Sequence, residues 1–221
     1  MIPCKIFEIK RALTLLFVMC SLCSSAQFLR DISGQPYLAK SSEEYIGSPL
    51  LFQTWAKARV VTDNGTIYEN MFVNVDLYQN MPIFLRDEKI YTFSDRINEL
   101  IVIDSPANAT FKRGNLIDKS LPDLFMEVIS NSPLLLKKQE RQLIEIPGYG
   151  NGTKNYRYVS GKTYYAVIDG KVAMINLTKE NAQKVFVQNW KLIQEYVQQN
   201  NISFKTEEGW RKITRFCSSV Q

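Results

Sequence analysis

The sequence predicts an α+β protein, in which a predominantly antiparallel β meander (a sheet, a sandwich or a partly open barrel) precedes two amphipathic C-terminal helices. Between about residues 54 and 176, apolar and polar side chains alternate and turn signals recur at short intervals, which is typical of consecutive antiparallel strands. From residue 177 onward, apolar residues recur every three or four positions, as in helices that bury one face. Strands followed by helices indicate the α+β class.

Two turns define the clearest strand pairs. Residues 56–62 and 66–68 flank Asp63-Asn64-Gly65, where Asn-Gly favours the positive φ angles of a tight hairpin. Residues 164–168 and 172–175 flank Asp169-Gly170 in the same way. In residues 71–78, aliphatic side chains alternate with a mixed polar and aromatic set, so we expect only one face of this strand in the core. Further strands are expected at residues 83–86, 90–93, 100–103, 111–117, 124–129, 134–146 and 156–160.

Two helices are expected to close the chain. Thr178 is a suitable N-cap for a helix over residues 179–199. Thr206 can cap a second helix, whose first turn carries Glu207 and Glu208 where their charges complement the helix dipole. The apolar side of this second helix contains Trp210, Ile213, Phe216 and Cys217.

Residues 1–26 have the three regions of a secretory signal peptide. Basic residues precede an apolar run over residues 12–23, and the small residues Ser24 and Ala26 suit cleavage before Gln27. The run is shorter than the roughly 20 residues that a membrane-spanning helix needs, so we expect no stable membrane anchor after cleavage. Lipidation is the alternative, but a large residue precedes both Cys20 and Cys23.

The mature chain, residues 27–221, is expected to form a single α+β domain. It would comprise a packed N-terminal arm (27–53), a β-rich body (54–176) and a helical tail (177–221). Of the four cysteines only Cys217 remains after cleavage, which excludes an internal disulfide and indicates a small core residue. Removing the signal lowers the formal charge from +5 to +3, an excess too small to indicate nucleic-acid binding.

The chain contains no histidine, which narrows the chemistry open to it. Ser-His, Cys-His and His-metal arrangements are excluded, and no glycine-rich phosphate loop or calcium loop is present. We therefore expect no enzyme, no catalytic residues, no metal and no cofactor. A hydrolase that uses two carboxylates remains an alternative, because spatial pairing of acids is invisible in sequence.

Four tyrosines are the candidate ligand-binding residues: Tyr156, Tyr158, Tyr164 and Tyr165. Aromatic rings on an exposed sheet face can stack on sugars or peptides, although tyrosines are also favoured cross-strand partners in half-buried sheets. A basic patch for anionic lipid or polysaccharide is a further possibility, against the alternative of a solvated face. Its residues would be Lys112, Arg113, Lys137, Lys138 and Arg141.

Several runs of the chain resemble a family of uncharacterised secreted proteins of Bacteroidota. They are GSPLLFQTWAKARV (47–60), NGTIY (64–68), VNVDLYQN (73–80), LPDLFMEVI (121–129) and YYAVIDGK (164–171). The resemblance would cover most of the mature chain and implies a secreted or cell-envelope setting in a Gram-negative bacterium. It brings no activity and no catalytic residues.

These observations predict an exported, non-enzymatic binding or structural protein of the bacterial cell envelope, located in the periplasm or secreted. Its expected partner is another envelope protein or a polysaccharide, and the sequence leaves the oligomeric state open. The alternative is a periplasmic carrier that shelters a lipid or another apolar ligand between sheet and helices. Phe72, Tyr78, Tyr91 and Phe93 would line such a cavity or meet the helices.

Overall fold

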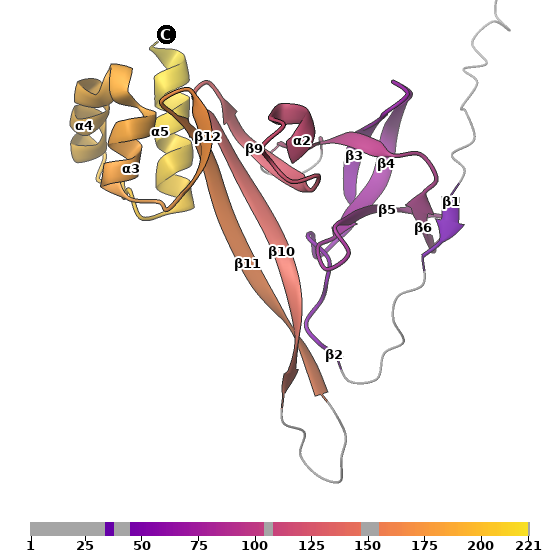
Figure 1. Ribbon diagram of the computed structural model, residues 1–221. Helices are drawn as coiled ribbons and strands as arrows, with labels where there is room; N and C mark the ends of the chain where they lie inside the picture. Colours follow the sequence, from indigo (N-terminus) through magenta and orange to yellow (C-terminus); the bar gives the residue numbers. More distant parts are fainter. Residues whose placement is uncertain (1–33, 38–44, 104–107, 147–154, 221) are drawn as a thin grey trace, which may run out of the picture. The chain divides into compact units, whose positions relative to one another are not determined.

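The computed structural model describes residues 34–37, 45–103, 108–146 and 155–220, all within the unit Ser33–Gln221 (Figure 1). The expected signal peptide and its cleavage position lie outside these ranges. No helix within them is both long enough and apolar enough to span a membrane.

The strands of the described part form one open, 12-stranded sheet with C-terminal helices. Their order in the sheet is β1-β6-β5-β4-β3-β7-β8-β9-β10-β11-β12, and β2 pairs with β11 outside this path. The sheet is mixed, because β2 runs parallel to β11 while the pairs along the path are antiparallel. The strands are β1 (Gly34–Pro36), β2 (Tyr45–Ile46), β3 (Ala56–Thr62), β4 (Ile67–Asp76), β5 (Met81–Arg86), β6 (Lys89–Phe93), β7 (Ile97–Val102), β8 (Ala109–Arg113), β9 (Phe125–Asn131), β10 (Leu134–Ile146), β11 (Asn155–Ile168) and β12 (Lys171–Ile175).

The end of β4 is buried on both faces, which corrects the expectation of a single core face. Val75 is 1% exposed, and so are the polar residues Asn74 and Asp76 on the opposite face. Asn74 is satisfied by the preceding loop: its Oδ1 accepts from the Phe52 N–H at 3.0 Å and its Nδ2 donates to the Phe52 carbonyl at 2.9 Å. A buried amide whose hydrogen bonds are made is tolerated, so the loop covers the polar face without a large penalty.

The strand expected over residues 111–117 ends early. β8 stops at Arg113, and Gly114–Ile117 form the short helix α2. Gly114 donates its N–H to the Leu124 carbonyl at 2.9 Å, and a Cβ at this position would lie 2.5 Å from the Pro122 carbonyl oxygen. The chain turns here because only glycine allows so close an approach of the two backbones.

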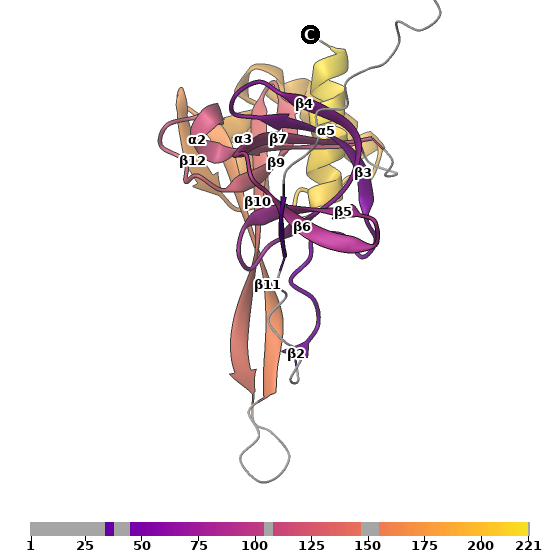
Figure 2. The same cartoon turned by 90° about the vertical axis from the view of Figure 1, so that its right-hand side faces the viewer.

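β10 and β11 form the longest ladder of the sheet, and Figures 1 and 2 show it extending beyond the helices. The register runs without a shift from Leu135↔Ala166 to Ile146↔Asn155. Strand residues alternate between faces, so Tyr156, Tyr158 and Tyr164 share one face of β11 and Tyr165 lies on the other. The separate short strands expected at 156–160 and 164–168 are thus one strand.

The expected helix over residues 179–199 is interrupted. It consists of α3 (Lys179–Val185), the 3₁₀ turn η1 (Val187–Asn189) and α4 (Trp190–Gln199). Phe186, at φ −106° and ψ 31°, leaves the helical conformation, and it is 3% exposed while the next residue, Val187, is 69% exposed. The break places Phe186 against the core, with its ring centroid 5.6 Å from that of Trp210. The last helix, α5 (Glu207–Ser219), is capped as expected by Thr206, whose side chain accepts from the Gly209 N–H.

The helices share one hydrophobic core with the inner ends of β10, β11 and β12. Trp210 and Ile213 of α5 and Ile193 of α4 have no exposed surface. Burial of such large side chains contributes about 2–3 kcal/mol each. A smaller cluster on the other face contains Leu121, Met126 and Leu136, with Tyr165 packed against it.

Candidate functional site

Tyr156 and Tyr158 belong to a group of aromatic rings at the outer part of β11. The Tyr45 ring lies 5.7 Å from that of Tyr156 and 5.9 Å from that of Tyr158, in a stacked orientation with the latter. Tyr78 meets Tyr158 edge-on at 5.9 Å. Tyr45 comes from β2 and Tyr78 from the turn after β4, so the group unites three distant segments. Such ring pairs contribute about 0.5–1.5 kcal/mol each beyond area burial.

A short parallel pair positions these rings. Tyr45 and Ile46 of β2 pair with Tyr156 and Arg157 of β11, and the chain then leaves the ladder at Gly47, whose φ is 92°. The following loop crosses to β10, where the Ser48 carbonyl accepts from the Arg141 Nε at 3.4 Å. We call residues 47–53 the crossing loop.

A cavity of about 530 Å³ lies between the crossing loop and the β10–β11 ladder. The loop residues lining it include Phe52 and Gln53, and the ladder contributes Arg141, Tyr158 and Ser160. We call this cavity the tyrosine cleft. It combines a half-buried aromatic ring with a guanidinium, an amide and hydroxyl groups, all of which can form hydrogen bonds with a polar ligand.

Polar contacts anchor the segments that lie beside the tyrosine cleft. The Asp76 carboxylate accepts from the Tyr37 hydroxyl at 2.6 Å and from the Tyr78 N–H at 2.8 Å. Burial, followed by the charge of Asp76, raises the pKa of Tyr158. Tyr158 therefore stays a neutral phenol at neutral pH, able both to donate and to accept a hydrogen bond.

Tyr164 lies on the same face but in a different environment, a buried group of charges that we call the ionic cluster. Its hydroxyl donates to Glu207 Oε2 at 2.8 Å. Lys137 Nζ bridges Glu127 at 2.6 Å and Glu207 at 2.8 Å, while Arg211 pairs with both carboxylates. The cluster joins β9, β10 and β11 to α5, so Tyr164 serves to dock the helix.

Tyr165 belongs neither to the tyrosine cleft nor to the ionic cluster. It packs against the buried cluster of Leu121, Met126 and Leu136 on the opposite face of the sheet. Of the four tyrosines selected from the sequence, the structure therefore brings only Tyr156 and Tyr158 together. Tyr45, Tyr78 and Arg141 complete their surroundings. No local sequence signal groups them with Tyr156 and Tyr158, because this neighbourhood depends on pairings between distant strands.

The charges of the ionic cluster fit a structural role. Burial would raise the pKa of Glu207, but hydrogen bonds from Lys137, Arg211 and Tyr164 outweigh it and lower the pKa to about 2. A carboxyl group ionised over the whole neutral range cannot act as a general acid there. Glu127 and Glu207, the two carboxylates of the cluster, are both paired with Lys137 and Arg211.

The low pKa of Glu207 predicts a dependence of stability on acid. Its unfolded pKa is near 4.3–4.5, so the folded state gains stability above that value and loses it as pH falls towards 2. We expect about 2–3 kcal/mol of the unfolding free energy to be lost between pH 6 and pH 2.5, and the rest only as pH falls below 2. Urea unfolding at pH 6 and pH 2.5 measures it.

The control for this prediction is the next residue along α5. Glu207→Gln should flatten the dependence between pH 6 and 2.5, whereas Glu208→Gln, whose side chain is 77% exposed, should retain that of the wild type. Equal acid sensitivity of Glu207→Gln and the wild type would contradict the assignment.

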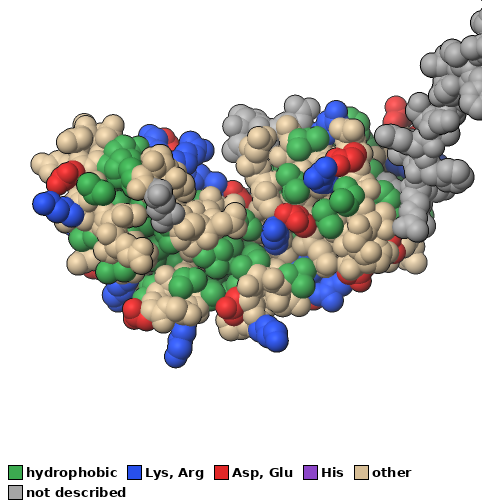
Figure 3. Space-filling model, turned by 90° about the horizontal axis from the view of Figure 1, so that it is seen from above, with side chains coloured by type: hydrophobic (Ala, Val, Ile, Leu, Met, Phe, Trp, Pro, Cys, Tyr) green, Lys and Arg blue, Asp and Glu red, His purple; other side chains and the backbone are tan. Residues whose placement is uncertain are grey.

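Most of the basic residues considered as a patch are paired with carboxylates. Lys112 pairs with Glu99 at 3.2 Å, Arg113 pairs with Asp123 at 3.2 Å, and Lys137 is buried in the ionic cluster. On the face shown in Figure 3, acidic and basic side chains are interspersed. Exposed ion pairs of this kind contribute about 0–1 kcal/mol to stability, and they neutralise the positive field that would attract an anionic surface.

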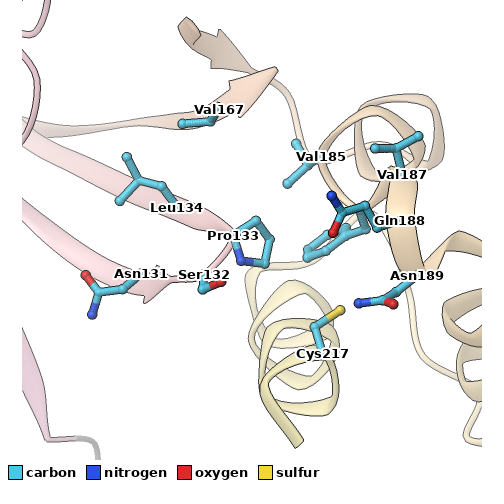
Figure 4. Close-up of a pocket in the computed structure, with 11 residues that line it drawn as sticks. Asn131, Ser132, Pro133, Leu134, Val167, Val185, Val187, Gln188, Asn189 and Cys217 are labelled. Atoms are coloured by element: carbon cyan, nitrogen blue, oxygen red, sulfur yellow. The ribbon is translucent and has the colours of Figure 1, made fainter. Parts of the chain in front are cut away.

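A second cavity, of about 360 Å³, lies between the β9–β10 turn and η1 (Figure 4). Figure 4 shows the Cys217 thiol pointing towards Asn189 across it. Burial raises the pKa of Cys217 to about 11, and the hydrogen bond with Asn189 offsets only part of that increase. The thiol is therefore protonated and unreactive at neutral pH, as expected of a small core residue.

Comparison with known proteins finds no family model, no curated protein and no solved structure that matches this chain.

Proposed function

We propose that this chain is an exported, non-enzymatic binding protein of the bacterial cell envelope that recognises its partner in the tyrosine cleft. The observation that carries the proposal is the cleft itself, a cavity of about 530 Å³ in which Tyr158 and Arg141 face the crossing loop. Tyrosine and arginine are the residue types that most often dominate binding energy in protein recognition. An exported setting is supported by the signal-like residues 1–26.

The state of the ionisable groups supports a binding role over catalysis. The carboxylates of the ionic cluster are paired, the Cys217 thiol has a raised pKa and the chain has no histidine. General acid–base catalysis at neutral pH requires a group whose pKa is near 7. The groups discussed here lie far from that value or are neutralised.

The carrier alternative has less support, because two of the aromatic residues expected to line its cavity, Tyr91 and Phe93, pack against the core residue Phe84. The Phe84 ring is 5.5 Å from that of Tyr91 and 4.7 Å from that of Phe93, and Phe84 itself is 1% exposed. Rings packed at these distances fill space that a lipid would need. Phe72, in contrast, is 51% exposed and is not among the residues that line the tyrosine cleft or the cavity beside η1.

The proposal is tested on the full chain produced in its organism of origin. We expect the protein in the envelope or culture fluid to begin at Gln27, shown by N-terminal sequencing, and to retain a partner in native mass spectrometry. Tyr158→Ala should lower the amount of retained partner by about tenfold or more, because hot-spot aromatics contribute about 2 kcal/mol.

The matched control is Tyr68→Ala, which removes a half-buried tyrosine of β4 outside the tyrosine cleft and should leave binding unchanged. A protein that keeps residues 1–26 and stays in the cytoplasm would refute the export proposal. Equal retention by the Tyr158 and Tyr68 variants would refute the cleft as the binding site.

A further inference from the structure

One stretch of β11 has an unpaired edge beside the tyrosine cleft. On one side, residues 158–163 pair with β10 throughout. On the other side, β2 pairs only as far as Arg157, and β12 begins to pair only at Tyr164. Within the described ranges no strand pairs with β11 between these points, so six residues, spanning about 20 Å, are open.

Both flanking strands are directed away from this gap by local features. β2 would continue along it, but the positive φ of Gly47 turns the chain out of the sheet and over β10. At the other end, Ile175 is the last paired residue of β12, and Thr178 then caps α3. The gap is therefore bordered by one parallel and one antiparallel strand, which leave the edge of β11 between them.

The backbone groups that point into the gap can be identified from the register. Ile168 and Lys171 close the two-residue turn at Asp169-Gly170, and such a turn closes on a pair that exchanges both hydrogen bonds. Even-numbered residues of β11 therefore direct their N–H and C=O groups away from β10. In the gap these residues are Tyr158, Ser160 and Lys162. The parallel pair Arg157↔Ile46 already uses the Tyr158 N–H, which donates to the Ile46 carbonyl, so the open N–H groups are those of Ser160 and Lys162.

The same three residues share a sheet face with Arg141, the cross-strand partner of Ser160. Neither Arg141 nor Lys162 forms an ion pair with a carboxylate in the described part of the chain, although most other cations near the sheet do so. A lysine on an open edge discourages pairing with basic strands. An acidic side chain on a strand added next to these two cations would be favourable, because opposite charges on neighbouring strands attract.

We propose that this gap binds an extended, acidic peptide segment of a partner protein, which adds as a strand to β11 between β2 and β12. Strand addition supplies backbone hydrogen bonds, while alternate side chains enter pockets that set specificity. Here those side chains face Tyr158 and Arg141 at the tyrosine cleft, and Lys162 beside it. This inference rests on the proposed binding function and names the class of partner.

The first test is hydrogen exchange measured residue by residue on the full chain. The amides of Ser160 and Lys162 should exchange rapidly in the free protein, while those of Val159 and Gly161, bonded to β10, exchange slowly. A blocked nonapeptide of alternating glutamate and threonine should slow the first set by about tenfold or more. Slow exchange of the first set in the free protein would show an edge already covered, and the proposal would fail.

The second test is affinity for the same peptide, labelled for fluorescence anisotropy. Ser160→Pro removes the outward N–H of residue 160, which is not bonded to β10, and should weaken peptide binding by about tenfold or more. Ser160→Thr keeps this N–H and should keep the affinity for the peptide. Lys162→Glu should weaken it similarly, unlike Lys191→Glu on α4. A peptide with lysine in place of glutamate should bind far more weakly.

Other outcomes distinguish failure of this inference from failure of the proposed binding function. Unaltered affinity in Ser160→Pro, or no binding of the acidic peptide, would overturn strand addition. Binding of an oligogalacturonate that depends on Arg141 and Tyr158 but not on the Ser160 N–H would also overturn it. That last result would leave the tyrosine cleft as a binding site, for an acidic polysaccharide.

Discussion

Replacing Trp210 by alanine is expected to lower the free energy of unfolding by about 3–5 kcal/mol. The side chain has no exposed surface, its ring packs against Phe186, and its indole N–H donates to the Phe204 carbonyl at 2.7 Å. The substitution leaves a cavity and an unsatisfied carbonyl, and both destabilise the fold. Equilibrium unfolding in urea, followed by circular dichroism, measures the change.

Trp190 provides a matched control for this prediction. It packs against Phe204 with ring centroids 5.7 Å apart, but it is only partly buried at the start of α4. Trp190→Ala should cost less than half as much as Trp210→Ala. A loss below about 1 kcal/mol for Trp210→Ala would show that the helices do not share a core with the sheet.

Lys137→Met is expected to have an effect of similar size, about 3–5 kcal/mol, through charge instead of volume. The Lys137 and Glu127 side chains are each 8% exposed, and Lys137 also holds Glu207. Without the ammonium group, two carboxylates share only Arg211, so negative charge stays buried without full compensation. Unfolding in urea at pH 7 measures the loss.

The double variant Lys137→Met with Glu127→Gln should recover part of that stability, because it removes one of the two uncompensated charges. Lys138→Met is the control: its side chain lies on the other face of β10 and pairs with Glu140 at 2.7 Å. A cost of under about 1 kcal/mol for Lys137→Met, equal to that of Lys138→Met, would contradict a buried ionic cluster.

The parts of the fold that sequence reasoning predicted are those whose signals are local. The Asp169-Gly170 turn has φ angles of 51° and 74°, as the hairpin prediction requires. β10 spans the predicted residues 134–146, and Thr178 and Thr206 both cap helices. At the first hairpin, only Gly65 has a positive φ, while Asn64 Oδ1 instead accepts from the Thr66 N–H at 3.0 Å.

The parts that sequence reasoning missed depend on tertiary contacts. The break at Phe186 follows from its packing on Trp210, and the buried Asn74 is stable only because the crossing loop satisfies it. The sequence predicts two strands in place of β11, because Gly161 interrupts the alternation of side chains. Glycine suits this position because the Glu140 side chain approaches it closely. Contacts between residues far apart in the chain produce no periodic pattern in the sequence.

Only part of the candidate site could be predicted from the sequence, for the same reason. Tyr156 and Tyr158 were selected because aromatics cluster locally, but that criterion also selected Tyr164 and Tyr165, which serve the ionic cluster and the core. Distinguishing them required the register of β10 and β11 and the parallel contact with β2. The tyrosine cleft is thus a product of topology more than of composition.

The position of α5 after the strands that it covers has a consequence for biosynthesis. Trp210 and Ile213 complete the core of β10, β11 and β12, so this part of the molecule cannot close while α5 remains in the ribosome. Nascent β10, β11 and β12 should stay sensitive to protease until α5 has left the ribosome. Until then, these strands remain accessible to chaperones.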